Sequence, residues 1–122
     1  MTTVNSRSRR VTGNAGEFAA ADFLKRLGYK ILERQYRFNH GEIDVVARDG
    51  GEIVFVEVKT RRSERFGRAE ESVTPKKQEL LRRTAEGYVE EKKCLNVPCR
   101  FDVVAVQVRN GKAEITHFKN AF

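Results

Sequence analysis

Charged residues interrupt the two most apolar segments of the chain, and this pattern limits the folds that the chain can adopt. The stretch GEIDVVARDGGEIVFVEVKT, residues 41–60, contains two runs rich in valine and isoleucine, which are typical of strands. Asp44, Glu57 and Lys59 stand within these runs. A buried charge costs several kcal/mol unless it is paired or bound to a metal. We therefore expect a buried sheet that brings these charged groups together.

The connection between the two strands determines which side chains share a face. Strand residues alternate between faces, so Glu57 and Lys59 point to the same side of the strand at residues 53–60. Gly50-Gly51 favours a tight turn of two or four residues back to the strand at residues 42–47. Either length puts Asp44 on the Glu57 face, directly across from it or one diagonal step away, within about 8 Å.

Three kinds of site would place two acids and a lysine on one face of a sheet. A salt bridge between Glu57 and Lys59 leaves Asp44 unexplained. A glycosidase pair needs only two acids, but the chain has no tryptophan, only three tyrosines to stack on sugars, and a net charge of +7. A divalent metal accounts for all three residues, because carboxylates are hard oxygen ligands and a lysine can act beside bound water.

Length and composition restrict the setting. The 122 residues suit one domain, expected over residues 13–122, after a mobile basic tail at residues 1–12. No apolar run approaches the ~20 residues of a membrane span, and the N-terminus lacks the apolar stretch of a secretory signal. We therefore expect a cytoplasmic protein with no membrane partner. Cys94 and Cys99 are expected to be reduced thiols, because no four-ligand zinc set can be assembled around them.

Two helices are predicted from capping signals and apolar spacing. The first runs from an Asn14 cap to Leu27, is stopped by Gly28, and turns Glu17 toward its apolar face. That face comprises Ala20, Ala21, Leu24 and Leu27. The second begins with Thr74 as cap and Pro75 as first residue. Its apolar stripe comprises Leu80, Leu81, Ala85, Tyr88 and Val89, with Lys77 and Gln78 one turn before it, where one or both can face the site.

The remaining apolar runs predict further strands. One lies at residues 29–38, and two more at residues 100–108 and 113–118 flank an Asn110-Gly111 turn. Asp102, near a strand start, is expected to be a hydrogen-bonding residue rather than a metal ligand. The order helix, three strands, helix, two strands indicates an α/β fold with a mixed central sheet flanked by helices. No glycine-rich phosphate loop is present.

The spacing of the charged residues resembles a nuclease signature. Asp44 followed by Glu57-Val58-Lys59 resembles the D…(D/E)-x-K pattern of the restriction-endonuclease-like PD-(D/E)XK superfamily. The fuller pattern is similar to the YraN-like family of small bacterial proteins. It consists of Gly16-Glu17, Ala20, Gly28-Tyr29, Gly41-Glu42-Ile43-Asp44, Phe55-Val56-Glu57-Val58-Lys59, Arg61, Phe66-Gly67, Lys77-Gln78 and Arg100-Phe101-Asp102. Gln35 stands where the family pattern has asparagine, and we expect it to lie outside the acid cluster.

The resemblance implies an αβββαβ core, like that of archaeal Holliday-junction resolvases, and a metal-dependent endonuclease that hydrolyses DNA phosphodiester bonds. Asp44, Glu57 and the Val58 carbonyl would bind Mg²⁺ or Mn²⁺. Lys59 would orient the attacking water or stabilise phosphate charge, and Glu17, a helix acid, would complete the metal shell or bind a second ion.

The resemblance also implies how DNA is bound. The basic run at residues 59–68 provides Arg61, Arg62, Arg65 and Arg68 for flanking phosphates, while Lys77 and Gln78 would position the backbone. Recognition would be structure-selective rather than sequence-specific, suited to branched or damaged DNA in repair or recombination. Resolvases act as dimers, which leaves a homodimer open. Two alternatives also stay open: a non-catalytic nucleic-acid-binding accessory protein, and an enzyme acting on RNA.

Overall fold

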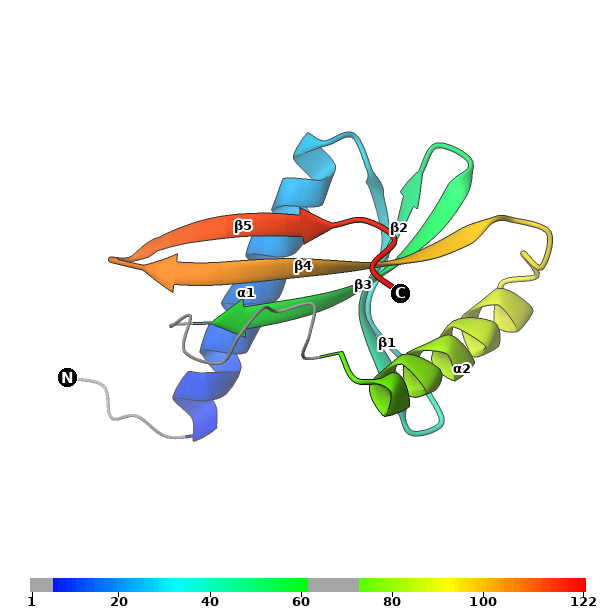
Figure 1. The fold of residues 1–122 in the computed structure, drawn as a ribbon, viewed down its shortest axis with the longest axis horizontal. Helices are drawn as coiled ribbons and strands as arrows, with labels where there is room; N and C mark the ends of the chain where they lie inside the picture. The colour runs from blue at the N-terminus through cyan, green and yellow to red at the C-terminus, as the bar shows by residue number, and fades with distance from the viewer. Residues whose placement is uncertain (1–5, 62–72) are drawn as a thin grey trace.

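Five strands form one mixed sheet with two helices packed on it (Figure 1). The computed structural model describes residues 6–61 and 73–122, with side chains from residue 15 onward. The elements are α1 (Ser6–Arg26), β1 (Lys30–Phe38), β2 (Gly41–Asp49), β3 (Glu52–Arg61), α2 (Pro75–Glu91), β4 (Cys99–Arg109) and β5 (Lys112–Phe118). The strands lie in sequence order, and only β3 and β4 pair in parallel. The predicted α/β architecture is confirmed.

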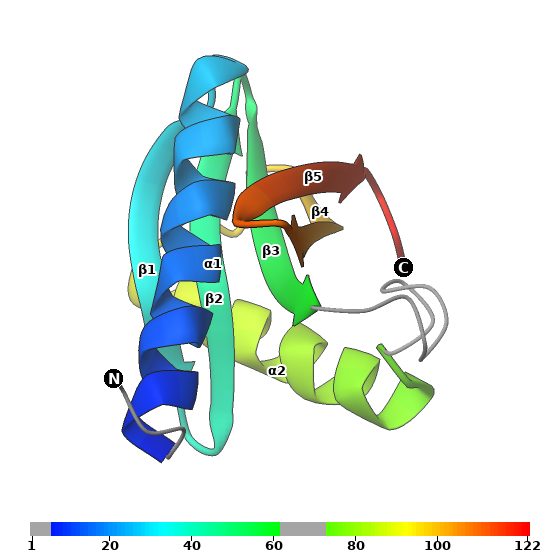
Figure 2. The same ribbon diagram turned by 90° about the vertical axis from the view of Figure 1, so that its left-hand side faces the viewer.

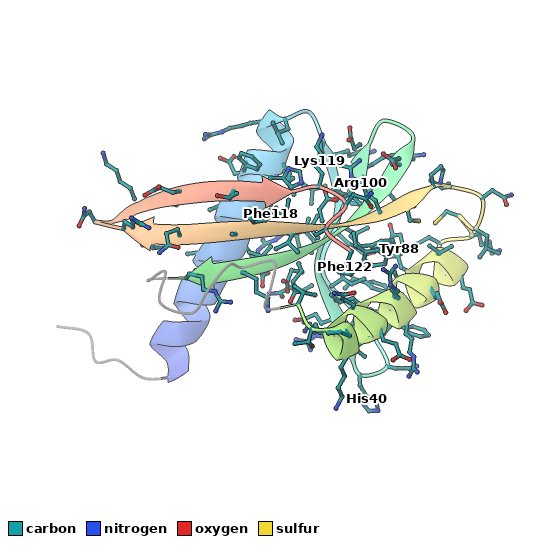
Figure 3. All side chains as sticks on the ribbon, viewed as in Figure 1. His40, Tyr88, Arg100, Phe118, Lys119 and Phe122 are labelled. Carbon is teal, nitrogen blue, oxygen red and sulfur yellow. The ribbon has the colours of Figure 1, made fainter. Side chains whose placement is uncertain are left out.

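Each helix covers its own face of the sheet (Figure 2). On the α1 face, Ala20 and Leu24 pack against valines of β2, β3 and β4. On the α2 face, Leu81, Ala85 and Tyr88 pack against residues of all four strands from β1 to β4, and Tyr88 points toward the sheet (Figure 3). Both faces of β3 are therefore buried, as its nearly continuous apolar sequence indicates. Neither helix, within the described residues, is long and apolar enough to cross a membrane.

The first helix differs from the prediction at both ends. It begins at Ser6 rather than after an Asn14 cap, so residues 6–12, expected in the tail, are helical. This segment has no proline and three arginines, which favour helix, so nothing in it forces a later start. Leu27, predicted on the apolar face, is 50% exposed. Leu27 follows the last helical residue and lies in a Schellman turn that ends at Gly28, whose φ is 95°. Its side chain therefore does not continue the apolar face of the helix.

The predicted turns and the second cap are confirmed. Asp49 pairs with Glu52, which leaves Gly50-Gly51 as a two-residue turn between β2 and β3. Asn110-Gly111, with φ 50° and 76°, connects β4 to β5 as the backbone of a type I′ turn requires. Thr74 caps α2 through its hydroxyl, which accepts a hydrogen bond from the Lys77 N–H at 3.2 Å, and Pro75 is the first helical residue.

A buried polar network joins the ends of several strands around Asp102, which is 0% exposed. Its carboxylate accepts hydrogen bonds from Arg100 Nε at 3.1 Å and from the Asn120 N–H at 2.9 Å, and lies 2.7 Å from His117 Nε2. Arg100 also donates to the hydroxyl of Tyr29 at 2.7 Å. Arg100 lies near the C-terminal residues in Figure 3. Asp102 is therefore a hydrogen-bonding residue, as predicted. Both cysteines are free thiols.

Candidate functional site

Strand β2 changes face at Asp44. Val45 packs in the core under α1, whereas Ile43 packs in the core under α2. Residues two apart on a regular strand share a face, so the alternation must break between them. Strand β1 is irregular at the same level, since Gln35 has φ 54° and the pairing passes from Arg34–Val45 directly to Tyr36–Ile43. Asp44 therefore projects from an irregular point of the sheet, where groups from both faces can reach it.

The pairing between β2 and β3 ends immediately before Asp44. The last paired residues are Val45 and Val56, so the next position puts Asp44 across from Glu57. There the backbone N–H of Val58 donates a hydrogen bond to Asp44 Oδ2 at 2.8 Å. The predicted register of β2 and β3 is confirmed. Asp44 and Glu57 lie just past the point where the pairing of these strands ends.

The two carboxylates share a poorly solvated environment. Glu57 is 6% exposed and Asp44 is half-buried. Burial raises the pKa of Asp44 to about 8, and the negative charges of Glu57 and Glu17 add to this increase, while the Val58 N–H only partly opposes it. Asp44 therefore holds a proton at neutral pH unless a cation arrives to offset the repulsion.

Two lysines from different elements meet Glu57. Lys59 Nζ lies 3.3 Å from Glu57 Oε2, and Lys77 Nζ of α2 lies 3.8 Å from the same oxygen. The salt-bridge interpretation therefore holds for Glu57 but gives Asp44 no cationic partner among the described residues. Gln78 points elsewhere, since its Nε2 donates to the Val73 carbonyl at 3.0 Å. Of the predicted helix pair, only Lys77 reaches the carboxylates.

Glu17 approaches from α1 and is held by β1. Gly16 lets α1 pack closely on β3, because a Cβ at this position would collide with the Thr60 hydroxyl. Gln35 Nε2 donates to Glu17 Oε1 at 3.1 Å, and Arg34 Nη2 lies 3.6 Å from the same oxygen. The expectation that Gln35 lies outside the acid cluster is wrong, because its left-handed backbone lets its side chain reach α1.

Sequence reasoning missed Arg34 and Gln35 as partners of Glu17. A usable signal existed, because Asn39-His40 separates two strands that pair up to Phe38 and Gly41. Counting back from this two-residue turn puts Gln35 across from Asp44, which would have drawn attention to β1.

Further cations follow Lys59 on β3 and surround Lys77 on α2. Arg61 ends β3, and its Nε is buried without a hydrogen-bond partner among the described residues. Arg62, Arg65 and Arg68, predicted to contact phosphates, lie outside the described residues. A groove of about 420 Å³ runs beside Lys77 at the start of α2. Its lining comprises Thr74, Lys76, Lys77, Glu79, Leu80 and Arg83, three cations against one acid.

The carboxylates of Asp44 and Glu57 fit a cation that is bound by two side chains and water rather than by three or more side-chain ligands. Over residues 6–61 and 73–122, no three carboxylate, imidazole or thiol side chains form a metal-binding group. Asp44 and Glu57 are nevertheless hard oxygen donors, and Mg²⁺ is commonly bound through one or two carboxylates plus water. Glu17, held by Gln35 and Arg34, would take part through water in this arrangement.

Comparison with known proteins places this chain in a family. Residues 16–106 match the sequence pattern of the "Uncharacterised protein family UPF0102". A UPF0102 protein of Caldicellulosiruptor saccharolyticus is 49% identical over 117 residues, covering 94% of this chain and 99% of the relative. One from Symbiobacterium thermophilum is 51% identical over 116 residues, covering 94% and 98%. One from Geobacter sulfurreducens is 43% identical over 118 residues, covering 96% and 92%. The chain therefore belongs to the UPF0102 family.

Proposed function

We propose that this protein is a metal-dependent phosphodiesterase that acts on DNA. The observation that carries the proposal is the Asp44–Glu57 pair at the open end of the β2–β3 ladder, with Lys59 Nζ 3.3 Å from Glu57. The element order from α1 to β4 agrees with the αβββαβ core of the restriction-endonuclease-like nucleases. The D…E-x-K spacing of this chain resembles the signature of the same nucleases.

Asp44, Glu57 and the carbonyl of Val58 would hold Mg²⁺ or Mn²⁺. When bound, the metal would polarise the scissile phosphate and lower the pKa of the attacking water. The Val58 N–H fixes the orientation of Asp44 by binding one of its oxygens at 2.8 Å. Asp44 would give up its proton as the cation is bound, because the repulsion that raises its pKa is then offset.

Lysines would supply positive charge where charge develops during phosphodiester hydrolysis. Lys59 reaches Glu57 from the same strand and would orient water or stabilise the phosphate oxygens. Lys77 approaches from α2, on the side of the groove lined by three cations. This groove and the basic segment from Lys59 to Arg68 would contact flanking phosphates, in keeping with a net charge of +7.

A non-catalytic nucleic-acid-binding role is the second candidate, and one observation favours it. Two of the three acids have partners within the chain: Glu57 has Lys59 and Lys77, and Glu17 has Gln35 and Arg34. A scaffold that has lost its metal would keep its remaining charges compensated in this way. Asp44, whose pKa is raised, has no such cationic partner in residues 15–61 and 73–122.

A cleavage assay separates the two candidates. The protein is incubated with labelled single-stranded, duplex, flap and branched DNA and with matching RNA, in Mg²⁺, Mn²⁺ or chelator. We expect metal-dependent cleavage that Asp44→Asn abolishes and that Glu114→Gln, an exposed acid of β5, leaves intact. Metal-independent binding without cleavage of any substrate would support the accessory role. Equal cleavage by Asp44→Asn would overturn the site assignment, and preferential cleavage of RNA would change the substrate.

A further inference from the structure

An exposed aromatic ring stands next to the carboxylate site. Phe18 is 63% exposed, more than any other phenylalanine whose exposure the structure describes. Single exposed apolar side chains are common on proteins, so the exposure alone assigns nothing. Phe18 directly follows Glu17 on α1, however, and its ring has a cation stacked over one face.

That cation is the guanidinium of Arg34, whose Cζ lies 4.0 Å from the centre of the Phe18 ring. Arg34 Nη2 also lies 3.6 Å from Glu17 Oε1, which is longer than an ordinary N–H···O hydrogen bond. Its Nε is buried and has no hydrogen-bond partner in the part of the chain that the structure describes. Arg34 therefore packs on the ring while much of its donor capacity stays unused.

The stacked pair lies on the α1 side of the site. Arg34 pairs with Val45 in the β1–β2 register, one residue from Asp44. Val45 packs in the core under α1, which places Arg34 on the same face of the sheet as Phe18 and Glu17. Since Arg34 covers one face of a ring that is still 63% exposed, the opposite face of Phe18 is open to solvent.

We infer that Phe18 and Arg34 form a stacking subsite for one unpaired nucleobase beside the Asp44–Glu57 pair. An open aromatic face backed by a guanidinium is the kind of platform on which single-stranded nucleic acids stack their bases, at about 1–3 kcal/mol per base. Bases inside a duplex are already stacked and offer no free face to a protein ring. The inference rests on the proposed function and deepens it: the substrates would carry unpaired nucleotides at the cleavage site, as single strands, flaps and branches do.

Binding without cleavage tests the subsite. Labelled single-stranded DNA and the fully paired duplex of the same sequence are titrated in chelator with the parent and with Phe18→Ala, Phe18→Trp and Arg34→Lys. Leu27→Ala, an exposed apolar residue at the end of the same helix, is the matched control. Phe18→Ala should weaken single-strand binding by roughly 5- to 150-fold, and duplex binding by less than about twofold. Phe18→Trp should retain single-strand affinity, and Arg34→Lys, which keeps charge but loses the planar group, should weaken it.

A fluorescent base analogue, 2-aminopurine, placed opposite a gap should change its emission on binding to the parent and to Leu27→Ala, but not to Phe18→Ala. Equal losses on single strand and duplex, or no loss on either, would overturn the subsite. If the parent and Phe18→Ala both cleave duplex and branched DNA at the same rate, the stacking subsite is disproved but the proposed phosphodiesterase function stands. If the parent neither binds nor cleaves any nucleic acid, the proposed function fails with it. Melting curves confirm that each variant is folded.

Discussion

The carboxylate of Asp44 accepts a hydrogen bond from the backbone N–H of Val58 at 2.8 Å. Asp44 is adjacent to Val45, the last paired residue of β2, and Val58 lies two residues past Val56, the last paired residue of β3. A side-chain oxygen thus occupies the place that a β2 carbonyl would have in a continued ladder. The bond fixes the position of Asp44, but it does not offset the repulsion from Glu57. Asp44 is therefore held in place at an electrostatic cost, and its substitution should show this.

Asp44→Asn should leave the metal-free protein at least as stable as the parent, because the amide is neutral, whereas folding of the parent must protonate Asp44 far above its ordinary pKa. The parent should gain about 2.7 kcal/mol of unfolding free energy when Mg²⁺ or Mn²⁺ is at a hundred times its dissociation constant. The variant, lacking one anionic ligand, should gain much less. Thermal unfolding with each metal and with chelator measures both effects.

Glu42→Gln is the matched control for this experiment, since Glu42 lies on the same strand but pairs with Arg37 at 2.7 Å near the surface. It should respond to metal as the parent does. An Asp44→Asn protein that melts well below the parent in chelator, with no metal response in either, would make Asp44 a structural residue.

The stability of the metal-free parent should fall relative to Asp44→Asn as the pH rises from about 4 to about 8. The unfolded chain releases this proton near the ordinary aspartate pKa of 3.8, whereas the folded chain keeps it up to a pKa of about 8. Over that range the folded state binds more protons, so raising the pH favours unfolding, by at most about 1.4 kcal/mol per pH unit. Denaturant titrations at pH 5 and pH 8 measure the difference in unfolding free energy between the parent and Asp44→Asn. The same difference at both pH values would contradict the raised pKa.

Lys59→Ala should reduce cleavage by about two to four orders of magnitude while metal-induced stabilisation persists, because its proposed role lies in water orientation and transition-state charge. Lys77→Ala is the comparison, since its ammonium lies 3.8 Å from Glu57 Oε2 rather than 3.3 Å and is more exposed. Its effect should be smaller on the rate and visible mainly in substrate affinity. Single-turnover rates at saturating metal measure the two variants, and an unchanged rate in Lys59→Ala would favour the non-catalytic role.

Asp102→Asn should cost about 1–3 kcal/mol of stability, in contrast to Asp44→Asn, because it disrupts the buried hydrogen bonds of Asp102. Arg100 would keep its ion pairs with Asp49 and Glu52. Burial disfavours ionisation of Asp102, but hydrogen bonds from His117, Arg100 and the Asn120 N–H outweigh it and hold the pKa below its usual value. This contribution is present above the ordinary pKa near 4 and disappears as the pH falls through the lower folded-state value. Urea unfolding at neutral pH tests the substitution, and a loss under 1 kcal/mol would show that the network is dispensable.

Local signals predicted those parts of the fold that depend on neighbouring residues. The Gly50-Gly51 turn determines the register of β2 and β3, so the position of Asp44 relative to Glu57 follows from counting residues. The Thr74-Pro75 start of α2 follows from its capping chemistry in the same way. Both needed only hydrogen-bonding rules and strand alternation.

The parts that were missed depend on contacts between distant segments. The left-handed Gln35 and the face change at Asp44 arise together where β1, β2 and α1 meet, and no short pattern marks them. The α1 start also escaped prediction, because the Asn14 cap signal is overridden within a longer helix. Glu17 was placed correctly by helical periodicity, but its partners Arg34 and Gln35 come from a strand with no apolar alternation to guide the assignment.

The three strands β1 to β3 are joined by two turns of two residues each, whereas β3 reaches β4 only through α2. Short loops close at the smallest entropic cost, so this three-stranded meander is favoured as the first part of the sheet to assemble. It already contains Asp44 and Glu57, whose repulsion would then oppose folding before β4 and the helices have docked. Asp44→Asn should consequently accelerate refolding more than it slows unfolding, which stopped-flow kinetics in chelator would reveal. The acidic pair would thus slow the assembly of the very strands that hold it.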